Sequence, residues 1–299
     1  MGKTASKKHH YLPQHYLNGF TNVRNTFFVY DKQKDNVFLT NTGGAFFENN
    51  LNTVTFPNGD SSDFLEDMYT KEENQFWGCL NRIRESNTQT PIELLDKMHL
   101  LLFLLFLHWR LPSNIEFVER LSEKAFLDNG EFDYFKLVNK SGGKVPKEVV
   151  EFMKDSSAFK KSFKQIIPFL PFYKDKGWAT KLENWRFLYT GDTKSWFIVG
   201  DNPILTRGGS DHDFVNCLKE FVFPVSGKIL LISIGKPVNE VLPPEFGIEY
   251  NTAIIQRSQR FVACQNRDFL EALIKYYKVY VQFGKTNTII PEMFKMLEK

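Results

Sequence analysis

The sequence predicts an α+β fold with a central helical core, an antiparallel β-sheet and an N-terminal β-hairpin. Strand-forming residues alternate from Thr26 to Thr40, apolar residues recur at helical spacing from Leu65, and short apolar runs between Gly and Pro turns follow Trp185. The chain has 299 residues and 42% hydrophobic content, so it can bury a sizeable core. We therefore expect one α+β domain over 1–299.

The first half is predicted to contain the hairpin and two long helices. Asp31–Asn36 supplies the polar turn of the hairpin. Asp60–Asp63 supplies N-cap residues for an amphipathic helix that ends near Arg84. Pro91 opens a second, buried helix, which Pro112 breaks or kinks.

The second half is predicted to be β first and helical later. Glycines and Asn make 128–146 a loop and a candidate mobile insert, and a helical pair is expected at 147–155 and 157–167. Antiparallel strands are expected at Trp185–Tyr189, Trp196–Val199, Phe221–Pro224 and Ile229–Ile234. Two closing helices are expected at Ile248–Gln265, starting near Asn251, and at Asp268–Val279, capped by Asp268.

Composition excludes several classes of protein. The net charge of +3 is too small to indicate nucleic acid by itself, and the three cysteines are far apart without CxxC spacing. No apolar signal segment opens the chain. The apolar run Met98–Trp109 is shorter than the roughly twenty residues that span a bilayer. We therefore expect a cytoplasmic protein with no membrane span.

Arg110 is the first candidate functional residue because it directly follows that apolar run. A helix that is apolar all round is buried, and a buried guanidinium needs a carboxylate or an anionic ligand. Arg110 can be interpreted either as part of a structural ion pair with Glu72 or Glu73 or as part of a functional site.

Two further glutamates lie on the first predicted helix. Glu66 and Glu73 are seven residues apart and so lie along one margin of the buried stripe. A carboxylate at the margin of the stripe can point into a cleft between elements and still remain partly solvated. Glu72 falls near the middle of the stripe.

The segment His10–Phe20 reads HYLPQHYLNGF and resembles the HYxPQxYLxxF opening of the family called domain of unknown function 4238 (DUF4238). Other residues agree with the family in the same order along nearly the whole chain, namely Glu66, Glu73, Arg110-Leu111-Pro112, Trp185, Asp201-Asn202-Pro203, Pro224-Val225-Ser226 and Asn251. Gly200 and Gly19 depart from the family, where Ser and Asn or a charged residue are expected. The resemblance implies no established reaction, but it singles out a site.

Two motifs keep a structural alternative beside the functional one. Asp201-Asn202 follows a predicted strand, where metal or substrate ligands often lie, yet Asp-Asn before Pro is also ordinary turn chemistry. His10 and Gln14 lie on a segment that equally reads as a strap packing Tyr11 on the core, with His10 bonded to a backbone carbonyl.

The leading hypothesis is a metal-dependent hydrolase acting on nucleic acid or a nucleotide. Oxygen and nitrogen donors suit Mg²⁺ or Mn²⁺, and an arginine can hold a phosphate. The expected catalytic residues are His10, Glu73, Arg110 and Asp201, the metal ligands are Glu66, Glu73 and Asp201, and the substrate-binding residues are Gln14, Asn202 and Asn251. Two alternatives remain: a non-catalytic nucleotide- or partner-binding sensor, in a setting such as bacterial defence, and a purely structural polar network.

Overall fold

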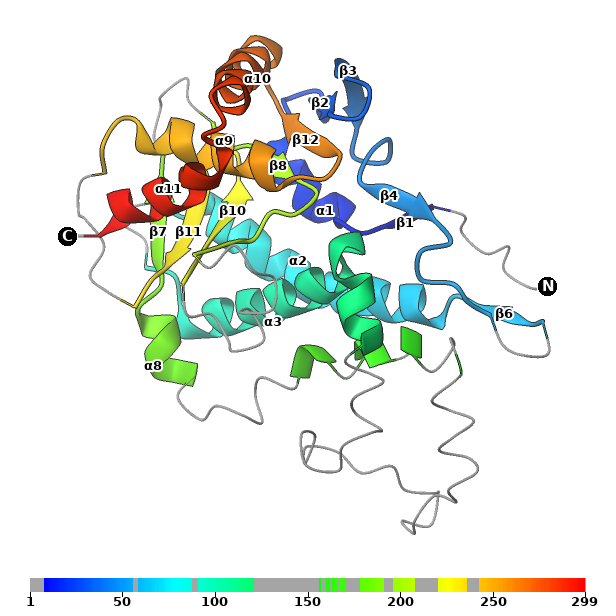
Figure 1. Ribbon diagram of the computed structural model, residues 1–299. Helices are drawn as coiled ribbons and strands as arrows, with labels where there is room; N and C mark the ends of the chain where they lie inside the picture. Colours follow the sequence, from blue (N-terminus) through cyan, green and yellow to red (C-terminus); the bar gives the residue numbers. More distant parts are fainter. Residues whose placement is uncertain are drawn as a thin grey trace.

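The computed structural model describes residues 8–55, 59–87, 91–120, 156, 160–161, 163–165, 167–169, 178–190, 196–207, 220–235 and 242–298. Within these ranges, helices and antiparallel sheets confirm the predicted α+β class (Figure 1). The predicted insert at 128–146 and the predicted helix at 147–155 lie outside the described residues, and the predicted helix at 157–167 is described only in part.

The predicted N-terminal hairpin is confirmed and belongs to a four-stranded sheet. Strand β2 (Thr26–Asp31) pairs antiparallel with β3 (Asn36–Asn41), in a register that places Val29 opposite Phe38. The sheet order is β3-β2-β12-β8, where β12 is Phe261–Cys264 and β8 is Val199–Gly200. The strand predicted at Trp196–Val199 is confirmed only at its end, because β8 covers Val199–Gly200. It joins the hairpin through β12, a strand some sixty residues later that pairs with both β2 and β8.

The other three predicted strands and one unpredicted strand, β9, form a second antiparallel sheet of order β7-β11-β10-β9. Its strands are β7 (Arg186–Tyr189), β9 (Leu205–Thr206), β10 (Phe221–Ser226) and β11 (Ile229–Ser233). Every residue of β10 and β11 is buried, as their continuous apolar sequence requires.

Two long helices form the centre of the described structure and pack against each other. Helix α2 (Phe64–Glu85) buries the predicted apolar stripe, and α3 (Leu94–Arg110) is buried on nearly all sides from Leu100 onward. Pro112 begins the short helix η2 (Pro112–Asn114) and ends α3 as expected.

The HYxPQxYLxxF segment forms a strap, residues 8–20, that lies on this helical centre (Figure 1). It consists of β1 (Lys8–His10), α1 (Gln14–Leu17) and η1 (Asn18–Phe20), and β1 pairs with β4 (Phe47–Asn49). Tyr11, Leu17 and Phe20 are buried in the core, which agrees with a packing role for these three. A two-stranded sheet, β5 (Val54–Thr55) and β6 (Ser61–Ser62), precedes α2.

The closing segment differs from the prediction. Helix α9 (Phe246–Arg257) is shorter than the predicted helix Ile248–Gln265, because Phe261–Cys264 forms β12 instead. Helix α10 (Arg267–Gln282) is capped by Asn266, not Asp268, since the Asn266 side chain accepts a hydrogen bond from the Phe269 N–H. An unpredicted helix, α11 (Ile289–Leu297), follows η6 (Thr286–Thr288).

Short helices complete the described elements, which are η3 (Phe163–Gln165), η4 (Ile167–Phe169) and α8 (Trp178–Glu183). Among the described residues, no helix is long and apolar enough to cross a membrane.

Candidate functional site

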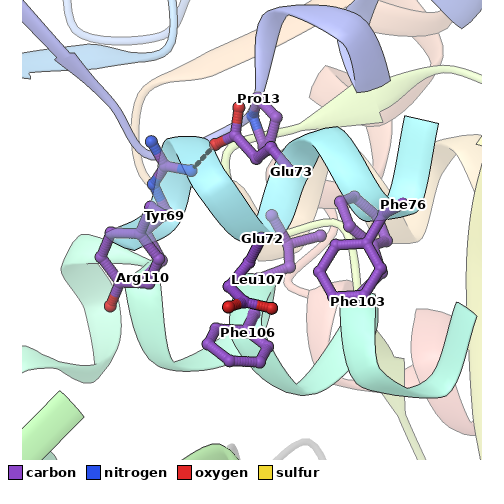
Figure 2. A pocket seen from close by; sticks show the side chains of 9 residues that line it. All are labelled: Pro13, Tyr69, Glu72, Glu73, Phe76, Phe103, Phe106, Leu107 and Arg110. Atoms are coloured by element: carbon purple, nitrogen blue, oxygen red, sulfur yellow. Dashed lines mark hydrogen bonds and ion pairs between the residues drawn. The ribbon is translucent and has the colours of Figure 1, made fainter. Parts of the chain in front are cut away.

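Arg110 lies at the centre of a polar cluster between α2 and α3. Its side chain is only 4% exposed, and its Nη1 donates to Glu73 Oε1 while Nη2 lies 3.4 Å from Glu66 Oε1. The guanidinium also lies over the Tyr69 ring, 4.7 Å from its centroid (Figure 2). The buried arginine thus has the carboxylate partner that its burial requires, and that partner is Glu73 rather than Glu72.

The two carboxylates that pair with Arg110 have further partners. Glu73 Oε2 lies 3.6 Å from His15 Nδ1, and Glu66 Oε2 accepts a hydrogen bond of 2.8 Å from the Asn52 amide. Burial raises the pKa of Glu73, but Arg110 and His15 lower it by more, so the net shift is downward. Glu73 is therefore ionised near neutral pH, and both glutamates are engaged by N–H donors.

A small hollow borders this cluster. It is lined by Pro13, Tyr69, Glu72, Glu73, Phe76, Phe103, Phe106, Leu107 and Arg110 (Figure 2). Its volume of about 10 Å³ is enough for one water molecule. Within the described residues, this hollow beside the Arg110 cluster is too small for a nucleotide.

His10 lies near the same cluster. Burial and the charge of Arg110 lower the pKa of His10, while Glu73 and a hydrogen bond to the Gly43 backbone oppose that shift. Its Nε2 is buried without a hydrogen-bond partner. His10 is therefore a neutral imidazole near pH 7, the form that accepts a proton.

Lys164 on η3 is a second buried cation in this region and was not predicted. Its side chain is 3% exposed, and burial together with the charges of Lys161 and Arg110 lowers the pKa of Lys164 to about 8. Lys161 donates from Nζ to the Thr53 carbonyl at 2.9 Å.

Asp201 lies away from the Arg110 cluster, and its carboxylate is bound by backbone N–H groups. Its Oδ1 accepts from the backbone N–H of Gln259 at 2.8 Å, and its Oδ2 accepts from those of Arg260 and Phe261 at 2.6 and 2.9 Å. Burial raises the pKa of Asp201 more than these hydrogen bonds lower it. The predicted metal ligands Glu66, Glu73 and Asp201 are not brought together, and in the described part of the chain no group of three or more His, Cys, Asp or Glu side chains could hold a metal ion.

Beside Asp201 the surface forms a cleft of two hollows that share Phe47, Arg260 and Phe261. The inner hollow, of about 150 Å³, is lined by Tyr11, Gln33, Phe47, Glu48, Pro112, Ser113, Asp201, Asn202, Gln259, Arg260 and Phe261. The outer hollow, of about 390 Å³, is lined by Asp31, Lys34, Asn36, Phe38, Gly44, Phe47, Arg260 and Phe261. The cleft thus lies where the strap, β4, the hairpin and the start of β12 meet.

Two polar side chains of the inner hollow lack partners. Tyr11 and Asn202 are each 4% exposed, and neither side chain hydrogen-bonds to any described residue. The Tyr11 hydroxyl and the Asn202 amide both keep some solvent exposure. Both groups are therefore open to the hollow that they line. Burial, followed by the charges of Asp201 and Glu48, raises the pKa of Tyr11, which keeps its hydroxyl protonated.

Arg260 stands at the boundary of the two hollows. Its Nε and Nη2 donate to Asp31 Oδ2 at 3.3 and 3.2 Å, and its guanidinium lies 4.4 Å from the Phe261 ring centroid. The side chain remains 41% exposed, and Nη1 has no hydrogen bond to the described residues. Arg260 is thus held in place by Asp31 while one edge faces the cleft.

Of the other predicted substrate-binding residues, Asn251 lies apart from both places, whereas Gln14 lies beside Gly43, whose backbone hydrogen-bonds His10. Gln14 is exposed and accepts from Thr42 Oγ1 at 3.4 Å. Asn251 is 1% exposed, accepting from the Ile198 N–H at 3.0 Å and donating to the Trp196 carbonyl at 2.9 Å. Both ends of the Asn251 amide therefore brace the segment before β8.

Sequence reasoning found Asn202 but missed Tyr11 and Arg260 as cleft residues. Tyr11 lies inside the HYxPQxYLxxF motif, so a signal was present, but it was interpreted as packing. Arg260 lies in the segment predicted as helix and carried no signal.

The comparison with family models decides the family. The model described as "Protein of unknown function (DUF4238)" matches residues 8–268. The chain belongs to the DUF4238 family. The match covers the strap, both central helices and β12, so both the Arg110 cluster and the cleft lie within it. No curated protein and no solved structure matches the chain.

Proposed function

We propose that this DUF4238 protein is a binding module for a phosphate-containing ligand of the nucleotide class, held in the cleft. The observation that carries the proposal is the pair of buried, unpartnered polar groups, Tyr11 and Asn202, beside the half-exposed guanidinium of Arg260. Both polar groups keep some solvent exposure and have no hydrogen-bond partner among the described residues, so a ligand in the hollow can hydrogen-bond to them in place of water.

The charges of the outer hollow suit phosphate. Arg260 and Lys34 both line it, and a guanidinium edge binds phosphate oxygens with paired hydrogen bonds. Phe38 and Phe47 add aromatic side chains to the same lining. A volume of about 390 Å³ lies within the roughly 300–1,000 Å³ range of ligand pockets.

Metal-dependent hydrolysis of such a ligand is the second candidate, and His10 favours it. Its imidazole is neutral, and its buried Nε2 has no hydrogen-bond partner among the described residues, so this nitrogen is free to accept a proton once a substrate reaches it. Binding ranks first because Glu66, Glu73 and Asp201, the carboxylates expected to hold a metal, already accept hydrogen bonds from N–H donors.

Isothermal titration calorimetry with ATP, GTP, CTP, UTP and short single-stranded RNA and DNA tests the proposal, with Mg²⁺ or Mn²⁺ and with chelator. We expect at least one of these ligands to bind. Arg260→Gln should weaken that binding by about tenfold or more, the worth of a charged hydrogen bond. Arg267→Gln, which changes an exposed arginine paired with Glu271 on α10, is the matched control and should bind as the wild type does.

Thermal melts of both variants check that they fold, and Lys34→Gln gives a second test at an exposed position. Absence of binding to every ligand would overturn the proposal. Chromatography of the same mixtures tests the second candidate, which predicts a product that disappears in His10→Gln.

A further inference from the structure

The two hollows of the cleft differ in charge. The inner hollow is lined by the carboxylates of Asp201 and Glu48 and by the neutral polar groups of Tyr11, Asn202, Ser113 and Gln33. The outer hollow is lined by Lys34 and by the ion pair of Arg260 with Asp31, and Arg260 also lines the inner hollow. Carboxylates therefore outnumber cations in the lining of the inner hollow, whereas cations outnumber the one carboxylate in the lining of the outer hollow. An anionic phosphate is therefore repelled from the inner hollow and attracted to the outer one.

The polar groups of the inner hollow suit a neutral heterocycle. The Asn202 amide offers an acceptor and two donors side by side, and the protonated Tyr11 hydroxyl can donate and accept. The edge of a nucleobase presents adjacent donors and acceptors, and an asparagine side chain binds such an edge with two hydrogen bonds. Asp201 does not compete for these groups, since its oxygens accept three backbone N–H groups.

Aromatic rings stand where the base would enter. Phe47 and Phe261 line both hollows and offer apolar contact to any base. One face of the Phe47 ring is covered by Lys8 Nζ, 4.4 Å from the ring centroid. Arg260 lies over Phe261 at the same boundary. Tyr11 and Asn202 thus line only the inner hollow, Lys34 lines only the outer one, and Phe47, Phe261 and Arg260 line both.

We infer that the inner hollow takes the base of a nucleotide, that Tyr11 and Asn202 determine which base is preferred, and that Arg260 holds the phosphates. This inference rests on the proposed function and deepens it. It separates two tasks, since Tyr11 and Asn202 contribute specificity while Arg260 contributes affinity common to all nucleotides.

The test compares affinities for the four nucleoside 5′-monophosphates, the four nucleosides and ribose 5-phosphate. In the wild type, we expect the best and worst bases to differ by about tenfold or more, as one or two hydrogen bonds predict. Asn202→Ala and Tyr11→Phe should reduce this ratio toward one and leave the affinity for ribose 5-phosphate unchanged. Arg260→Gln should weaken all the phosphorylated ligands by the same factor and preserve the ratio.

Asn287→Ala, at an exposed position on η6, is the matched control for Asn202→Ala and should change neither quantity. Thermal melts verify that each variant folds, and Tyr11→Phe keeps the buried ring if Asn202→Ala does not fold. An unchanged base ratio in folded Asn202→Ala and Tyr11→Phe, with Arg260→Gln still weakening nucleotides, would overturn the inference and leave the proposed function standing. Failure of every probe to bind would overturn the proposed function and the inference together.

Discussion

Glu72 and Glu73 are neighbours on α2 that differ in what they contact. Glu73 pairs with the buried Arg110 and lies 3.6 Å from His15, whereas Glu72 lines the small hollow and has no ion pair with a described residue. A helix turns by roughly 100° per residue, so adjacent side chains point in different directions. Glu73 therefore pairs with Arg110, whereas Glu72, one residue earlier on the helix, does not.

Replacing Glu73 should reveal the cost of leaving Arg110 without its main partner. We expect Glu73→Gln to lower the free energy of unfolding by about 1–3 kcal/mol, because the buried Arg110 keeps only its longer contact with Glu66, at 3.4 Å. Glu72→Gln is the matched control, and its effect should stay within about 0.5 kcal/mol. Urea denaturation measures both changes. A Glu73→Gln protein as stable as the wild type, or more stable, would instead mean that the pair is held under strain for function.

The destabilisation caused by Glu73→Gln should disappear at acidic pH. The pKa of Glu73 is lowered in the folded protein, so its stabilisation is complete above the unfolded value of about 4.3 and is lost as the pH falls through the folded value. The stability curves of the wild type and Glu73→Gln should therefore converge below about pH 4.

At the scale of elements, Arg84 of α2 fastens the strap to the rest of the described structure. Its guanidinium donates to the carbonyls of His15 and Tyr16 at 3.0 and 2.7 Å, and to that of Val225 on β10 at 3.4 Å. One side chain thus joins α2, the end of α1 and β10, and a cation at the end of a helix is favourably placed.

Gly19 makes room for this contact, which accounts for a departure from the family pattern. A Cβ at Gly19 would lie 2.7 to 2.9 Å from the Arg84 guanidinium. The second departure has a similar cause, because a Cβ at Gly200 would collide with the Ser258 hydroxyl. Each glycine is therefore matched to one particular neighbour.

We expect Gly19→Ala to destabilise the protein by about 1–3 kcal/mol, because the added methyl must displace the Arg84 guanidinium. In an Arg84→Met background the same change should cost less, giving a coupling free energy of about 0.5 kcal/mol or more. Gly247→Ala is the control, since no heavy atom lies within 4 Å of its added methyl in α9, and it should be neutral or stabilising. Denaturation of the four proteins of the cycle gives the coupling, and strictly additive effects would contradict it.

Helices and strands with a clear hydrophobic periodicity could be predicted from the sequence. For short apolar runs, the sequence did not determine whether a helix or a strand forms. The hairpin, α2 and α3 follow from alternation, helical spacing and Pro punctuation. Phe261–Cys264 reads FVAC, a run too short to distinguish a strand from a helix, and it becomes a strand because β2 and β8 flank it. Helix α11 was not predicted, and Pro291 is compatible with it because it lies in the first turn, where proline costs little.

At the scale of the whole described structure, the candidate site was only partly predictable. The partner of Arg110 followed from the cost of burying a charge, which a sequence pattern can reveal. The cleft did not, because Tyr11, Asn202 and Arg260 come from three distant segments that meet around β12. Whether a polar side chain finds a hydrogen-bond partner depends on the assembled structure, so residue spacing in the sequence cannot predict it.

Asp201 holds together the strand pairing on which that assembly depends. Its carboxylate accepts from three consecutive backbone N–H groups, 259–261, just where β12 begins to pair with both β2 and β8. An asparagine has a single acceptor oxygen, so at least one of these N–H groups would lose its partner in Asp201→Asn. We expect a loss of about 1–3 kcal/mol in unfolding free energy, the usual cost of an unsatisfied buried donor. Removal of a buried carboxylate with a raised pKa offsets part of that loss.

Hydrogen exchange distinguishes this local effect from general destabilisation. In Asp201→Asn the amides of 259–264 and of β2 should exchange faster than in the wild type, while those of β10 and β11, in the other sheet, should change less. Asp268→Asn, an exposed aspartate at the start of α10, is the matched control and should leave both sheets unchanged. Equal acceleration in the two sheets would mean that Asp201 stabilises the fold as a whole rather than the β12 connection. Because 259–261 also line the cleft, only the local outcome fits a role for Asp201 in shaping the ligand site through the backbone that carries Arg260.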